Sequence, residues 1–128
     1  MQYLLLIYTD ESLLQSLPDG EADAMMRHCF ASADAMKTEG TLLQSQQLEA
    51  AAGARSVRIR DGQVSVSDGP FAETRELLGG FNLIEANSLE QAVEIASRFP
   101  WARTGCVEVR AIRDMAAVRR QVGSPPAP

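Results

Sequence analysis

"YLLLIY", residues 3–8, is the stretch that decides the fold. The run is apolar throughout, lies between polar residues and is too short to form a helix. Alternate side chains of a strand point to opposite faces of a sheet, so the run predicts a central strand buried on both faces. Helices of the same chain have to cover one face, and the other face needs cover as well.

The helical cover is encoded in two amphipathic segments, residues 21–40 and 87–100. Gly40 is a natural terminator for the first helix, and Ser88 with Gln91 forms a capping box at the start of the second. The predicted apolar stripes are Ala22, Met25, Met26, Cys29, Ala33 and Met36 in the first helix, and Leu89, Ala92, Val93, Ala96 and Phe99 in the second.

Further strands are predicted at residues 41–50, 79–86 and 106–112. The middle one begins with Gly79 and Gly80. Glycines inside a strand allow another backbone or a ligand to approach closely, so this end of the strand is a candidate contact point.

A β-hairpin is predicted between the second and third strands, within "SVRIRDGQVSVSDG", residues 56–69. Asp61-Gly62 separates two alternating runs, which is the strongest short-range hairpin signal. Asp68 follows Val66 by two positions, so its carboxylate points to the apolar face and needs a partner there. A two-residue turn pairs Arg60 with Gln63, Ile59 with Val64 and Val57 with Val66, and it places the apolar side chains on one face.

The order of elements is strand, helix, strand, inserted hairpin, strand, helix, strand. This order predicts an α+β fold, a ferredoxin-like βαββαβ sandwich with helices on one face of an antiparallel sheet. Since the first strand is apolar on both sides, we expect a second subunit to cover the other face, giving a homodimer.

The 128 residues fit one domain. We expect residues 1–112 to form it, with a loop at residues 10–20. Residues 113–122 are expected to form a C-terminal helix, capped by Asp114, and residues 123–128 a disordered tail.

Composition excludes several classes of function. The net charge of −5 argues against nucleic acid as a partner. No apolar run is long enough to span a membrane, and the opening residues do not resemble a signal peptide, so we expect a cytoplasmic protein. With one histidine and two cysteines, a metal site is not expected, and no motif predicts a nucleotide or flavin cofactor. Cys29 and Cys106 are interpreted as small buried hydrophobic residues without a disulfide.

The stretch "DGPFAETRELLGGFNLIEANSLEQAVEIASRFPWARTGCVEVR", residues 68–110, closely resembles the YCII-related family in its DGPF-domain branch. "YLLLIY" and the junction "MKTEGTLL" match as well, and the resemblance covers roughly residues 1–112. It implies a ferredoxin-like fold of the dimeric α/β-barrel superfamily, with a pocket in each subunit. It also implies His28 and Asp68 as an acid–base pair, and an association with sigma-factor systems in a regulatory setting.

The residues themselves leave both roles open. His28 lies on the flank of its helix, among small side chains, either with room for a ligand or as a solvated or interface histidine. Asp68 either lines a pocket or bonds the amides of its own turn. As a pocket residue it either orients the imidazole or is itself the base.

Three further residues are candidates for substrate binding. Arg75 is suited to binding a substrate carboxylate. Alternatively, Arg75 forms a solvated loop face together with Glu73 and Glu76. Tyr8 ends the first strand, where its hydroxyl either reaches a pocket mouth or packs in the core. Phe71 follows the Asp-Gly-Pro turn, and the turn alone does not explain an aromatic residue there.

Three hypotheses remain. The first is a cofactor-free enzyme in which His28 and Asp68 carry out proton transfer, isomerisation or elimination on a small organic molecule that the sequence does not identify. The second is a non-catalytic ligand-binding or regulatory module linked to a sigma factor. The third is a structural dimer with no chemistry in its pocket.

Overall fold

The sheet has the predicted topology. The computed structural model describes residues 1–72 and 74–128 and contains a four-stranded antiparallel sheet in the order β2-β5-β1-β6. Both neighbours of β1 pair with it over most of its length, which confirms "YLLLIY" as a central strand. The strands are β1 (Gln2–Asp10), β2 (Leu42–Gln47), β5 (Glu76–Glu85) and β6 (Gly105–Ala111).

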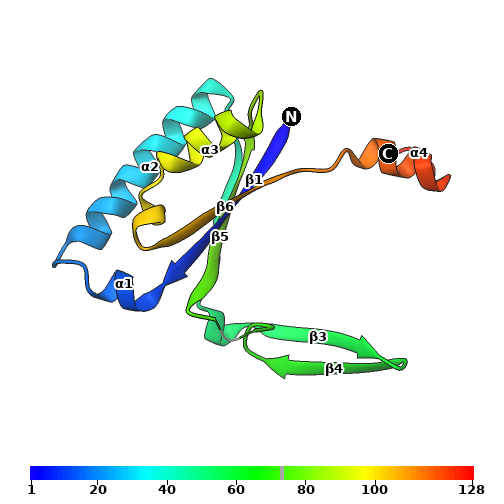
Figure 1. Cartoon of the computed structure of the whole chain (residues 1–128), viewed down its shortest axis with the longest axis horizontal. Helices are drawn as coiled ribbons and strands as arrows, with labels where there is room; N and C mark the ends of the chain where they lie inside the picture. The colour runs from blue at the N-terminus through cyan, green and yellow to red at the C-terminus, as the bar shows by residue number, and fades with distance from the viewer. Residues whose placement is uncertain (73) are drawn as a thin grey trace.

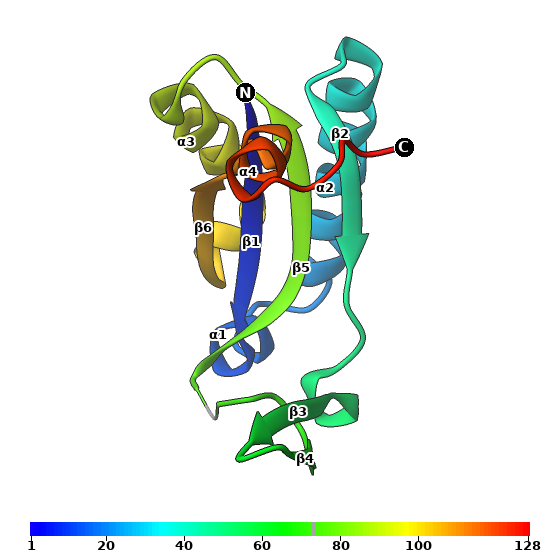
Figure 2. The ribbon, with the colours of Figure 1, turned by 90° about the vertical axis from the view of Figure 1, so that its right-hand side faces the viewer.

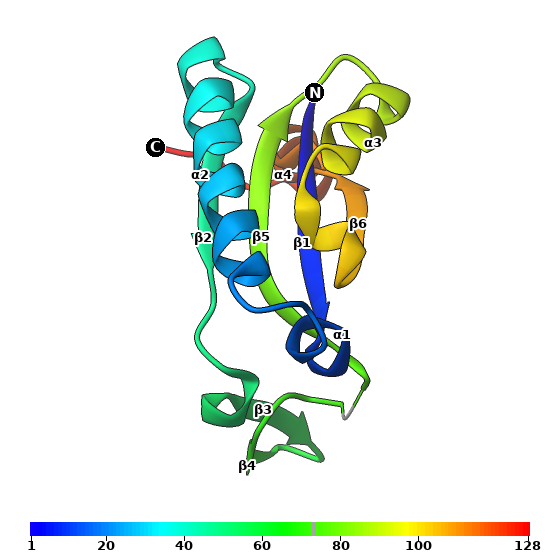
Figure 3. The same ribbon diagram turned by 90° about the vertical axis from the view of Figure 1, so that its left-hand side faces the viewer.

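Two long helices cover one face of this sheet, as Figures 1 and 3 show. They are α2 (Glu21–Glu39), which ends at the predicted glycine, and α3 (Leu89–Ser97). Beneath them Leu5 and Ile84 are fully buried, with Tyr3 beside them. This arrangement is the ferredoxin-like α+β fold, and the alternation of β1 decides which of its side chains enter the core.

The buried stripe of α3 differs from the predicted one. Leu89 and Val93 are half exposed, at 50% and 51%, whereas Ile95 is buried. The buried residues are Ala92, Ile95, Ala96 and Phe99. They recur at helical spacing and form a narrower apolar stripe than the predicted one. Leu89 and Val93 lie on the solvent side of that face.

A short helix replaces part of the predicted loop at residues 10–20. This is α1 (Glu11–Gln15), and Asp10 caps it by accepting hydrogen bonds from the backbone N–H groups of Ser12 and Leu13. Two 3₁₀ turns, η1 (Ala51–Gly53) and η2 (Pro100–Arg103), also join elements. The prediction missed α1 because five residues show too little periodicity to be recognised.

The hairpin has the predicted register throughout, including the pairs Ile59–Val64 and Val57–Val66. It consists of β3 (Arg55–Arg60) and β4 (Gln63–Asp68), which form a sheet of their own. Asp61 and Gly62 have positive φ angles of 51° and 74°, as the tight turn requires.

The apolar face of the hairpin does not enter a core. Val57, Ile59, Val64 and Val66 are all exposed, at 62% to 65%. Figures 1 and 2 show why, because the hairpin projects beyond the end of the main sheet and away from α2 and α3. The prediction that Asp68 points toward an apolar interior is therefore wrong in the single chain.

The second face of the main sheet is not covered by α2 or α3. Leu4, Leu6 and Tyr8 point to this open face and are half-buried. The last helix, α4 (Met115–Val122), lies on this side of the molecule, capped by Asp114 as predicted. Within the described residues, no helix is both long and apolar enough to cross a membrane.

Candidate functional site

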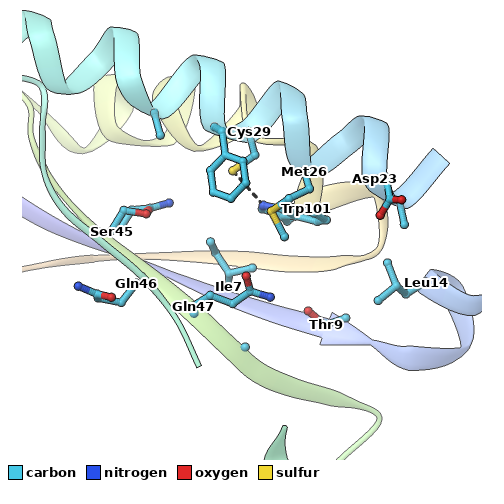
Figure 4. Close-up of a pocket in the computed structure, with 16 residues that line it drawn as sticks. Ile7, Thr9, Leu14, Asp23, Met26, Cys29, Ser45, Gln46, Gln47 and Trp101 are labelled. Carbon is cyan, nitrogen blue, oxygen red and sulfur yellow. Dashed lines mark hydrogen bonds between the residues drawn. The ribbon is translucent and has the colours of Figure 1, made fainter. Parts of the chain in front are cut away.

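A cavity of about 490 Å³ lies between α2 and the main sheet, and we call it the helix-side cavity. Figure 4 shows Ile7 and Thr9 of β1 on one side of it and Cys29 of α2 on the other. Most of its wall is apolar, with a few polar groups, which is typical of small-molecule sites. The cavity is lined by Ile7, Thr9, Leu14, Ala22, Asp23, Met26, Cys29, Phe30, Ala33, Ser45, Gln46, Gln47, Gly79, Gly80, Asn82 and Trp101.

The predicted close approach at Gly79-Gly80 is confirmed. A Cβ atom on Gly80 would lie 2.8 Å from the carbonyl oxygen of Gln46, so only glycine lets β2 pair this closely. A Cβ atom on Gly79 would lie 3.3 Å from Thr9 Oγ1. Both glycines line the helix-side cavity, and their lack of side chains helps to keep it open.

The polar groups of the cavity come from several elements. Asp23 and Cys29 lie on α2, Thr9 on β1 and Asn82 on β5. The indole Nε1–H of Trp101, in η2, donates a hydrogen bond to Cys29 Sγ at 3.3 Å, which fixes the ring against α2 (Figure 4). Ser45, Gln46 and Gln47 of β2 also line it, so the cavity offers a carboxylate, a thiol, hydroxyls and amides within a mainly apolar wall.

A second cavity, of about 800 Å³, brings together all three predicted substrate-binding residues. Tyr8 comes from β1, Phe71 from the Asp-Gly-Pro-Phe loop and Arg75 from the residue before β5. Phe71 and Arg75 are strongly exposed, and the guanidinium Nε of Arg75 lies 3.8 Å from Asp10 Oδ2. Glu76 lines this cavity as well, while Glu73 lies outside the described residues.

The Tyr8 hydroxyl donates a hydrogen bond to Glu108 Oε1 at 3.2 Å. Partial burial raises the pKa of Tyr8 above its ordinary value of 10.0, and the hydrogen bond and charge of Glu108 add to the rise. Tyr8 is therefore a neutral hydrogen-bonding group at physiological pH rather than a base.

Asp10 is a buried carboxylate with a structural role. The hydroxyl of Ser12 donates a hydrogen bond to it at 2.6 Å, and this bond is the main reason that the pKa of Asp10 lies below 3.8. Backbone N–H donors from Leu13 and Ser12 act in the same direction, against the effect of burial. Asp10 is thus held ionised as the cap of α1.

His28 and Asp68 are not brought together in the single chain. His28 is exposed on α2, whereas Asp68 ends β4 with an 89% exposed side chain. Among the described residues no hydrogen bond or ion pair joins them, and neither lines a cavity described above. Asp68 pairs instead with Arg55 Nε at 3.1 Å, so its carboxylate is engaged across the hairpin.

Both cysteines are free thiols, but their burial differs from the prediction. Cys29 is half-buried and packs against the core, while Cys106 is exposed on β6. The described residues include no group of three or more His, Cys, Asp or Glu side chains arranged to hold a metal ion.

The sequence interpretation missed Asn82, Asp23 and Trp101 as cavity residues. A signal for Asn82 was present in the sequence. Asn82 lies two positions before Ile84 on the same strand, so both side chains face the same apolar layer. Asp23 lies in the first turn of α2, where an acidic residue is common, so nothing in the sequence marked it as a cavity residue. Trp101 follows the end of α3, and only the course of η2 brings it against α2.

Comparison with known proteins agrees with the predicted family. The YCII-related domain model matches residues 1–116. An uncharacterized protein of Rhizobium meliloti is 37% identical over 112 residues, which cover 86% of this chain and 90% of that protein.

A solved structure shares the fold. It is 5-chloro-2-hydroxyhydroquinone dehydrochlorinase from Burkholderia phenoliruptrix, in complex with 2,5-dihydroxybenzoquinone. The TM-score is 0.50 at 15% identity, and the match covers 88% of this chain and 94% of that one. This similarity supports the fold, and the family follows from the domain match and the Rhizobium relative. The chain therefore belongs to the YCII-related family.

Proposed function

We propose that this protein binds a small organic molecule in the helix-side cavity and carries out cofactor-free proton-transfer chemistry on it. The observation that carries the proposal is the cavity itself, about 490 Å³ between α2 and the sheet, with a mainly apolar wall and a few polar groups. Its volume accommodates a single substituted ring with space to spare.

A structural relative supports the size of the ligand. The dehydrochlorinase with the same fold acts on a chlorinated hydroxyhydroquinone and was solved with a dihydroxybenzoquinone. A dehydrochlorination removes a proton and a chloride, which is acid–base work on a small ring. We extend to this chain only the general type, a small cyclic molecule and a proton transfer.

The proposed acid–base pair requires a second copy of the chain. His28 and Asp68 are exposed on separate parts of the molecule, so they can meet only if another protomer brings its hairpin to α2. A second copy would also cover the open sheet face of Leu4, Leu6 and Tyr8. The homodimer is thus part of the proposal, and Asp23 is the carboxylate that lines the cavity without any partner chain.

The cavity is tested by filling it. In the Ala33→Phe variant a ring replaces a methyl group at the wall, and we expect thermal stabilisation by 2,5-dihydroxybenzoquinone to disappear. Ala35→Phe is the matched control, since Ala35 is exposed on the same helix and does not line the cavity. Because Ala33 also packs against the core, Ala22→Phe provides a second filled cavity. Unchanged stabilisation in both filled variants would contradict the proposed site.

The acid–base pair is tested through the only histidine of the chain. Its imidazole gives one set of nitrogen-15 signals, which we would follow against pH in the wild type and in Asp68→Asn. We expect the two titration curves to differ at concentrations where two copies associate. Superimposable curves at all concentrations would remove the pair.

A non-catalytic ligand-binding or regulatory module, including one that meets a sigma factor, is the second candidate. It is favoured by the separation of His28 from Asp68 in the single chain and by their absence from the cavity wall. Binding of ring compounds without any turnover, together with unchanged His28 titration in Asp68→Asn, would select this candidate.

A further inference from the structure

Asn82 is a polar residue in a position that the fold reserves for apolar side chains. It lies in the middle of β5, between Gly80 and Ile84 on the helix-facing side, and pairs with Leu5 of β1. The residue is only 2% exposed. An asparagine at such a position costs stability unless its amide is hydrogen-bonded.

The side-chain amide of Asn82 has no such bond within the described part of the chain. None of the side-chain hydrogen bonds there involves it, whereas the buried Asp10 carboxylate accepts bonds from Ser12 and Leu13. Asn82 lines the helix-side cavity, a space that a ligand can enter. Among the described residues, the fully enclosed Thr104 hydroxyl has no hydrogen-bond partner either, but Thr104 lines neither cavity.

The wall around Asn82 is suited to a flat ring. Phe30 and Trp101 supply two aromatic side chains, and Met26 adds a polarizable thioether. Trp101 is held in place by its hydrogen bond to Cys29. These groups bind a ring by contact area and do not distinguish one polar substituent from another. Among the polar side chains that line the cavity, only that of Asn82 is buried, so we assign the selection of substituents to its amide.

We propose that Asn82 is the specificity-determining residue of the cavity, and that the ligand is a flat cyclic compound whose carbonyl or hydroxyl group hydrogen-bonds the Asn82 amide. An amide both donates and accepts, so it recognises either group. This inference rests on the proposed function, since it names the ligand class for the same cavity. It depends on neither His28 nor Asp68.

A pair of compounds of the same shape tests it. In 4-methylphenol a hydroxyl group stands where 1,4-dimethylbenzene has a methyl group, and the single tryptophan of the chain reports occupancy by fluorescence. We expect the wild type to bind the phenol at least about fivefold more tightly, the value of one hydrogen bond. In Asn82→Leu this preference should disappear while the dimethylbenzene still binds.

The outcomes separate the two proposals. If the wild type binds both compounds equally, or Asn82→Leu keeps the preference, the role of Asn82 is refuted and the cavity stands. If neither compound nor 2,5-dihydroxybenzoquinone binds the wild type, both proposals fail.

Thermal unfolding of Asn82→Leu without ligand provides an independent readout. The substitution removes no protein hydrogen bond and adds apolar contact, so we expect a melting temperature equal to or above that of the wild type. A purely structural asparagine would instead give a large fall, which would overturn the inference. Asn82→Leu should therefore lose ligand selectivity without losing stability.

Discussion

The main sheet and the β3–β4 hairpin each gather apolar side chains on one face, but they bury these faces to very different extents. In the sheet, Leu5 is fully buried, in one cluster with core residues of α2 and α3. In the hairpin, Val64 and its three apolar neighbours remain mostly exposed. The alternation predicts which side chains share a face in both regions. What covers that face depends on elements distant in sequence, and the single chain supplies helices for only one of the two.

The largest test compares a truncation in each region. Leu5→Ala leaves a cavity under the helices and should lower the free energy of unfolding by about 2–5 kcal/mol. Val64→Ala, its matched partner, removes methyl groups that are already in contact with water and should cost less than about 1 kcal/mol. Urea denaturation at a fixed, low protein concentration measures both.

Equal losses in the two variants would break the comparison. They would mean that the hairpin face is covered in solution, as a second copy of the chain would cover it.

The open sheet face gives the next test. We expect light scattering at micromolar concentration to give twice the mass of the chain, and Leu6→Arg to give a folded monomer, because the new charge would lie in the interface. Ser67→Arg, on the polar and exposed face of the hairpin, is the control and should stay dimeric. A monomeric wild type would refute the dimer.

A smaller effect is expected on the acid stability of the body, by which we mean the main sheet with its helices. Hydrogen bonds lower the pKa of Asp10 in the folded protein below 3.8, so the unfolded chain takes up this proton first. The stabilisation is therefore complete above the ordinary pKa and is lost as the pH falls through the lowered one. We expect Asp10→Asn to show a shallower loss of stability than the wild type between pH 5 and pH 2, measured by urea unfolding.

Asp19→Asn serves as the control for acid stability, since Asp19 is an exposed loop residue. It should follow the wild-type curve. An Asp10→Asn curve parallel to the wild type would show that the cap contributes nothing to acid stability.

The smallest global effect is expected at the hairpin turn. Gly62 has a φ angle of 74°, which a β-branched residue adopts only under strain, so Gly62→Val should disrupt the turn. Because the hairpin forms a separate sheet, the melting temperature of the body should fall by only a few degrees. Amide hydrogen exchange would show faster exchange in β3 and β4 alone. A fall as large as that of Leu5→Ala would mean that hairpin and body unfold together.

Much of the fold was predictable because its signals are local. The apolar run of β1, the capping residue Ser88 and the turn Asp61-Gly62 each determine their own neighbourhood. The exposure of Leu89 was not predictable in this way, because the rotation of α3 on the sheet depends on how distant side chains pack.

The candidate site likewise has residues that local signals predicted and residues that they did not. Tyr8, Phe71 and Arg75 meet at one cavity because the end of β1 pairs with the start of β5, as the fold class requires. His28 and Asp68 were linked by resemblance alone, and no local pattern states whether two such residues meet within one chain. Asn82 was predictable as an inward-facing residue, but its place at a cavity was not, since that depends on which side chains lie across the core.

The base of the hairpin has a consequence for protein engineering. The N–H of Gly69 donates to the carbonyl oxygen of Ala54 at 2.7 Å, so the chain returns almost to the point where the hairpin leaves the body. Residues 55–68 can therefore be replaced as one unit. A short linker could replace them, or a reporter domain could be inserted at the Asp61-Gly62 tip, while the body keeps its own connectivity.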